Sequence, residues 1–104
     1  MPELEGDAEV DRARRRLAQV NQAIRKLELT AVRIGNVLTS LGATLKTNPG
    51  GVIFEKESYQ SGFPELCVLK KADQKDVSAD AIRALVEDYR KLVTEKQKLE
   101  GKLG

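Results

Sequence analysis

The amino-acid sequence predicts a mainly α protein of 104 residues with a helix–hairpin–helix layout. We expect an antiparallel coiled coil or helical bundle with a small β-like insertion. Apolar residues recur at alternating spacings of three and four along two long stretches, which is typical of packed helices. An Asn-Pro-Gly-Gly turn separates the first stretch from the rest, and 33% of the residues are charged, which suits solvated helix faces. Residues 1–104 are therefore predicted to form one helical domain that assembles into oligomers.

Residues 7–45 are predicted to form one long helix. Asp7 is expected to cap its start, and Pro49 with the two glycines after it is expected to end it. All seam positions of a seven-residue repeat are apolar, which indicates coiled-coil or bundle packing. These seam positions are Val10, Ala13, Leu17, Val20, Ile24, Leu27, Ala31, Ile34, Leu38, Leu41 and Leu45.

Residues 51–75 are predicted to form a β-hairpin with a long loop. Val52-Ile53-Phe54 and Leu66-Cys67-Val68-Leu69 are short runs that favour strands, and residues 59–64 between them resemble a loop. The second run could instead begin a helix, because Lys70-Lys71-Ala72 is compatible with one. Whether residues 66–75 are strand or helix therefore stays open at this point.

Residues 78–103 are predicted to form a second helix, capped by Asp76 or Ser78. Lys96 occupies the one polar seam position. Val86 and Val93 widen the apolar stripe, which favours a bundle over a two-stranded rope. The apolar seam positions are Ile82, Leu85, Tyr89, Leu92, Leu99 and Leu103.

The stretch between residues 29 and 54 has only two charged residues, Arg33 and Lys46. Glycine inside a helix costs about 1 kcal/mol relative to alanine, so Gly35 and Gly42 need a packing reason or mark a bend. We expect this part of the helix to be covered, either by the chain's own hairpin and second helix or by another subunit, and both can hold together. A row of small residues would let a neighbouring backbone come close: Ala31, Gly35, Thr39 and Ala43.

Protein contacts are expected along both helices, in a homo-oligomer or a hetero-oligomer. At about 1.5 Å per residue the first helix outruns the second, so its first ten or so residues are expected to invite a partner helix. The predicted interface residues are Val10, Leu17, Ile24, Ile34, Gly35, Leu38, Thr39, Leu41, Ala43, Leu85, Tyr89, Leu92 and Leu99.

A basic cluster lies near the start of the first helix: Arg12, Arg14, Arg15 and Arg16. It can be a solvated or salt-bridged flank, a contact for a protein partner, or a contact for nucleic acid. Nucleic acid is the least favoured partner, because acidic residues precede the cluster and aromatic residues that could stack on bases are missing. The net charge of +2 is also small for that role.

The inventory of reactive residues argues against catalysis, a cofactor or a metal site. The chain has no histidine and one cysteine, so histidine general bases and thiolate zinc sites are excluded. Cys67 lies in an apolar run and is expected to be an inert thiol, while Glu55, Glu57 and Glu65 are expected to be exposed charges. No apolar run is long enough to span a membrane, the acidic first residues lack a signal core, and we expect an intracellular, cytoplasmic location.

These residues predict a non-catalytic structural or adaptor subunit that assembles through its helices. In the order and length of its elements the chain resembles prefoldin subunits, which are chaperones whose two coiled-coil arms join at a small β region. That resemblance implies a holdase chaperone as the main alternative. A small nucleic-acid-binding oligomer is the third.

Overall fold

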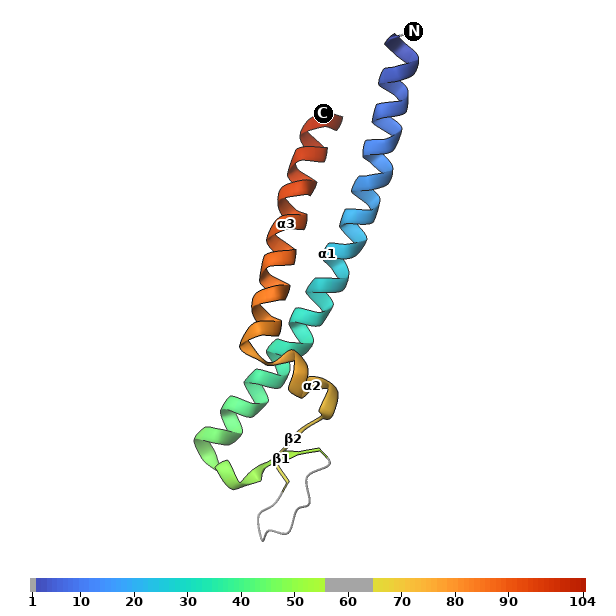
Figure 1. Ribbon diagram of the computed structural model, residues 1–104. Coiled ribbons are helices and arrows are strands. Elements are labelled where there is room, and N and C mark those ends of the chain that lie inside the picture. Colours follow the sequence, from blue (N-terminus) through green and yellow to red (C-terminus); the bar gives the residue numbers. More distant parts are fainter. Residues whose placement is uncertain (1, 56–64) are drawn as a thin grey trace. The chain divides into compact units, whose positions relative to one another are not determined.

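The computed structural model describes residues 2–55 and 65–104, with side chains at residues 8–55 and 65–104. The described protein is mainly helical and has a small two-stranded sheet (Figure 1). The contacts divide it into two compact units, which we call unit 1 (Met1–Leu29 with Leu85–Gly104) and unit 2 (Thr30–Ala84). The elements are α1 (Pro2–Thr47), the 3-10 helix η1 (Pro49–Gly51), β1 (Val52–Phe54), β2 (Cys67–Leu69), α2 (Lys71–Asp76) and α3 (Ala79–Leu103).

The first helix is confirmed, with one correction at its start. α1 begins at Pro2, so Asp7 lies inside the helix, and the prediction that Asp7 caps it is wrong. Proline suits a first helical turn because the N–H it lacks would be unpaired there in any case. At the other end the predicted stop is confirmed, because α1 ends at Thr47 and η1 begins at Pro49.

In unit 1, α1 and α3 run side by side in opposite directions. Arg16 of α1 forms an ion pair with Glu95 of α3, and residues nearer the start of α1 share a cleft with residues nearer the end of α3. Val20 and Ile24 are the buried seam residues, at 1% and 8% exposure. The other predicted seam residues of this unit are half-buried: Val10, Ala13, Leu17, Leu27, Leu85, Tyr89, Leu92, Lys96, Leu99 and Leu103.

The start of α3 confirms one of the two predicted caps. The backbone N–H of Ala81 donates a hydrogen bond of 3.1 Å to the Ser78 hydroxyl oxygen, which is the N-cap arrangement. Asp76 instead contacts Arg33. Ser78 therefore sets where α3 begins.

The predicted hairpin is wrong, because β1 and β2 are parallel. Val52 pairs with Cys67, Ile53 with Val68, and Phe54 with Leu69. A hairpin reverses the chain within a short turn, whereas parallel strands need a connection of roughly a dozen residues or more. Residues 55–66 supply a connection of that length, and the predicted loop at 59–64 lies outside the described residues.

Residues 66–75, which could be strand or helix from the sequence, contain both: strand β2 is followed directly by the short helix α2. The backbone N–H of Lys71 in the first turn of α2 donates to Glu55 Oε2 at 2.7 Å, which satisfies a donor that the helix itself leaves unpaired. Gln74 Nε2 donates to the Leu69 carbonyl oxygen at 3.1 Å and fastens α2 to β2. Arg33 of α1 forms ion pairs with Asp73 and Asp76 of α2.

The buried apolar core is small. Among the described side chains it consists of Val20 and Ile24 in unit 1, and of Ile34, Ile53 and Leu69 in unit 2. Several large apolar residues remain exposed, and most of them belong to unit 2. No helix in the described part of the chain has an apolar stretch long enough to cross a membrane.

Candidate protein-interaction surfaces

The first candidate surface is one side of α1 in unit 2, which we call the uncharged face. Val32, Leu38 and Leu45 are its large side chains, and they are 61%, 40% and 49% exposed. The small residues between them are exposed as well, apart from half-buried Gly42. The uncharged face consists of Ala31, Val32, Gly35, Leu38, Thr39, Gly42, Ala43 and Leu45.

The adjoining side of the same helical stretch is covered by the chain itself, one turn of the helix from Leu38 and Leu45. Ile34 and Thr44 are buried at 7% and 8% exposure, and Leu41 is half-buried. Two of the predicted interface residues, Ile34 and Leu41, therefore lie on the inward side. This stretch was expected to be covered either by the chain's own hairpin and second helix or by another subunit. Packing within the chain covers only one side of it.

The glycines on the uncharged face have no packing role within the chain. Apart from adjacent residues and the nearby backbone of α1 itself, no heavy atom of the described chain lies within 4 Å of the position that a Cβ would take at Gly35 or Gly42. Nor do they end the helix, since α1 continues through both of them to Thr47. Thr39 Oγ1 donates to the Gly35 carbonyl oxygen at 2.9 Å, so its hydroxyl is already satisfied inside the helix.

The charges beside the uncharged face are few, and one of them is already paired. Arg33 contacts Asp73 and Asp76, and the side-chain hydrogen bond with Asp76 is the main cause that raises the pKa of Arg33. Lys46, which is exposed, lies in the last turn of α1, one helical turn beyond Gly42 and so at the end of the uncharged face. The sequence analysis missed both aspartates. Two features of the sequence could have indicated this contact. Arg33 is one of only two charged residues between positions 29 and 54, and the two aspartates are three residues apart, a spacing that places them on one side of a helix.

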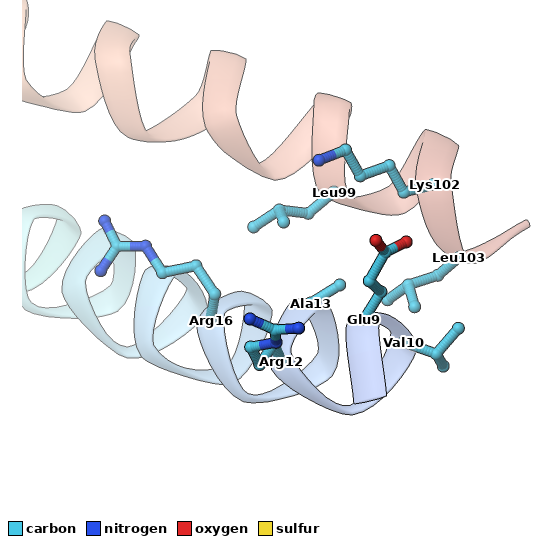
Figure 2. A pocket seen from close by; sticks show the side chains of 8 residues that line it. All are labelled: Glu9, Val10, Arg12, Ala13, Arg16, Leu99, Lys102 and Leu103. Atoms are coloured by element: carbon cyan, nitrogen blue, oxygen red, sulfur yellow. The ribbon is translucent and has the colours of Figure 1, made fainter. Parts of the chain in front are cut away.

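The second candidate surface lies in unit 1, between the first turns of α1 and the last turns of α3, and we call it the end cleft (Figure 2). It has a volume of about 710 Å³. In Figure 2 the Glu9 carboxylate points from α1 toward α3. The residues that line the end cleft are Glu9, Val10, Arg12, Ala13 and Arg16 of α1, and Leu99, Lys102 and Leu103 of α3.

The predicted basic cluster is divided by the end cleft. Arg12 and Arg16 line it, whereas Arg14 and Arg15 are exposed and are not among its lining residues. Arg16 holds Glu95 through two contacts, Nε to Oε1 at 2.5 Å and Nη2 to Oε2 at 3.0 Å. This hydrogen bonding lowers the pKa of Glu95 and raises the pKa of Arg16. Part of the cluster is therefore a salt-bridged flank.

The described residues form no group of three or more potential metal ligands among His, Cys, Asp and Glu. Cys67 is half-buried and its thiol is free. Glu55 accepts the hydrogen bond from the first turn of α2, Glu65 is exposed, and Glu57 lies outside the described residues. The uncharged face and the end cleft instead have apolar side chains that suit contact with another protein.

A scan against protein-family models and searches of curated proteins and of solved structures found no match to this chain.

Proposed function

We propose that this chain is a non-catalytic helical subunit that assembles by pairing the uncharged face of α1 with the same face of a second copy. The observation that supports this most is the exposure of Leu38 and Leu45 beside two glycines that have no neighbour. Full burial of a leucine side chain stabilises a protein by about 1.5–3 kcal/mol, so covering these side chains is favourable. The small core within each unit leaves this apolar surface uncovered.

The spacing of leucines and glycines supports a second copy as the partner. Leu38 and Leu45 are seven residues apart, and so are Gly35 and Gly42. If Leu38 lies opposite Gly42 of an antiparallel second copy, Leu45 lies opposite Gly35 of that copy, and twofold symmetry repeats both contacts. A parallel pair would instead set leucine against leucine. The antiparallel pair thus places large side chains over recesses, as packed helices do.

The polar groups near the uncharged face support the same arrangement. Burial of a charge or an unpaired hydroxyl would oppose association. Arg33 at the border already contacts two aspartates, and the Thr39 hydroxyl is bonded within α1. The pairing therefore buries no unpaired polar side chain from these two positions, and Lys46, at the end of the face, can keep its charge in water on its long side chain.

Substitution of the two glycines tests the proposal without harming the single chain. Gly35→Gln with Gly42→Gln should raise the stability of α1, because glutamine favours a helix by about 0.5–1 kcal/mol per site over glycine and both sites are open. The same change fills the recesses of the paired face. We expect sedimentation equilibrium at micromolar concentration to show a dimer or larger for the parent and a monomer for the variant.

Gly101→Gln is the matched control, because Gly101 lies in α3 and its Cβ position is open as well. It should leave the molar mass unchanged. A parent that is monomeric throughout the micromolar range, or a glycine double variant that still assembles, would contradict the proposal.

The two rival functions have less support. A holdase that grips clients with its helix tips needs exposed apolar residues there, but the exposed large apolar side chains in the described part of the chain lie at residues 29–45, 54, 66 and 68. A nucleic-acid role needs free cations, and one of the four clustered arginines, Arg16, is held by Glu95.

A further inference from the structure

The end cleft has an apolar floor that the chain covers only in part. Val10 and Ala13 of α1 and Leu99 and Leu103 of α3 all line it, and all four are half-buried. The open volume of about 710 Å³ borders these residues. An apolar floor between two helices is a surface that the apolar side of a third helix can cover.

The charges around this floor are unequal. Arg12 and Arg16 lie on α1 and Lys102 on α3, whereas Glu9 is the only acidic residue among the described residues that line the cleft (Figure 2). Glu95 neutralises Arg16. Within the part of the chain that the structure describes, neither Arg12 nor Lys102 forms an ion pair. The cleft therefore has an available cation on each of its two helices.

We propose that the end cleft binds an amphipathic helix of another protein in which Asp and Glu side chains flank the apolar stripe on both sides. The stripe covers the floor, and the carboxylates face Arg12 on α1 and Lys102 on α3. Complementary charges of this kind fix the orientation of a partner and raise its association rate. A nucleic acid fits less well, because the described residues that line the cleft form an apolar floor and include no aromatic side chain for stacking. The proposal is independent of the pairing of the uncharged face, since the two surfaces share no residue.

A pair of designed peptides tests this proposal on the full-length protein. One peptide is an amphipathic helix with a leucine stripe flanked by glutamates, and the other has lysine in place of every glutamate. We expect fluorescence anisotropy to show that the protein prefers the acidic peptide by about tenfold or more. Binding should shift the methyl NMR signals of Val10, Leu99 and Leu103.

Charge reversal locates the binding site. Arg12→Glu with Lys102→Glu should abolish or reverse the preference for the acidic peptide. Arg14→Glu with Arg15→Glu changes the net charge by the same amount outside the cleft, so this control should keep most of the affinity.

Four results would overturn the proposal. The first is equal binding of the two peptides, and the second is an equal loss of affinity for the acidic peptide in both double variants. The third is tight binding of a duplex oligonucleotide that is lost in the Arg12 and Lys102 variant. The fourth is a fall in molar mass caused by that same variant, which would assign the cleft to a second copy of this chain.

Discussion

Two stretches of the same helix, residues 8–29 and residues 30–47, differ in what they present to water. In the first, apolar seam residues such as Val20 turn inward, and the exposed positions carry many charges, among them Arg14, Arg15 and Arg25. In the second, Ile34 turns inward in the same way, but the side of the helix that adjoins it is the uncharged face. The seven-residue repeat runs through both. The repeat therefore identifies the helix, but it does not identify the inward side throughout, because its seam residues Ala31, Leu38 and Leu45 are exposed in the second stretch. There the lack of charge around these exposed side chains is what distinguishes the two stretches.

The largest difference is expected between a charge placed on the inward side of residues 30–47 and one placed on the outward side. Ile34→Asp places a carboxylate at a position that is 7% exposed, so the protein loses about 1.5–3 kcal/mol of side-chain burial and gains a desolvation cost. We expect circular dichroism to show a large fall in melting temperature.

Val32→Asp is the matched control for that change, because Val32 lies on the same stretch of α1 but is 61% exposed. At concentrations low enough to suppress assembly it should change the free energy of unfolding by less than about 0.5 kcal/mol. If the two variants melt alike, the distinction between an inward and an outward side of α1 is wrong.

A smaller effect is expected at the boundary between α2 and α3. Ser78→Ala removes the hydroxyl that accepts the N–H of Ala81, and the loss of such a cap costs about 1 kcal/mol. Urea denaturation followed by circular dichroism measures this change. Ser78→Asp should restore most of the loss, since aspartate is an equally good cap, and a failure to restore it would point to a cause other than capping.

The smallest expected effect concerns the ion pair that joins α1 and α3 in unit 1. Because the folded pKa of Glu95 lies below its unfolded value, ionised Glu95 stabilises the fold above its unfolded pKa of about 4.3, and this contribution is lost as the pH falls through the folded pKa. Glu95→Gln should therefore lower the melting temperature slightly at neutral pH, and its difference from the parent should shrink in acid.

Glu100→Gln provides the comparison for this measurement. Glu100 is an exposed carboxylate in the same helix and forms no ion pair with the described residues. The two glutamine variants should differ near neutral pH and converge in acid. Identical profiles for the two variants at every pH would mean that the contact between Arg16 and Glu95 does not stabilise unit 1.

The helices were predictable from the sequence because their signals are local. The apolar repeat, the stop at Pro49 and the cap at Ser78 each depend on a few neighbouring residues. The structure confirms the helices, the stop and the cap, whereas the predicted seam residues Ala31, Leu38 and Leu45 are exposed. The direction of strand pairing was not predictable in this way. The three-residue strands β1 and β2 could form a hairpin or a parallel pair equally well, because the side chains of such short strands do not determine the direction of pairing.

The candidate surfaces were predictable only in part, for a related reason. The sequence indicated that residues 29–54 carry few charges, but which of these residues face outward depends on what packs against α1. Ile34 and Leu38 were therefore equivalent in the sequence, although Ile34 is buried and Leu38 is exposed. The contacts of Arg33 with Asp73 and Asp76 join residues forty or more positions apart. Spacing along the chain does not reveal such contacts.

The most direct test of the central claim is a spin-label distance between two copies of α1. In a Cys67→Ser background, Thr47→Cys provides a labelling site that is exposed and outside the uncharged face. In the antiparallel pair Thr47 lies opposite Arg33 of the second copy, so the two labels are offset by fourteen residues, or about 21 Å along the helix axis. We predict an electron paramagnetic resonance distance above about 20 Å. A distance near the helix separation of about 10 Å, as in a parallel pair, or no dipolar signal at micromolar concentration would contradict the account.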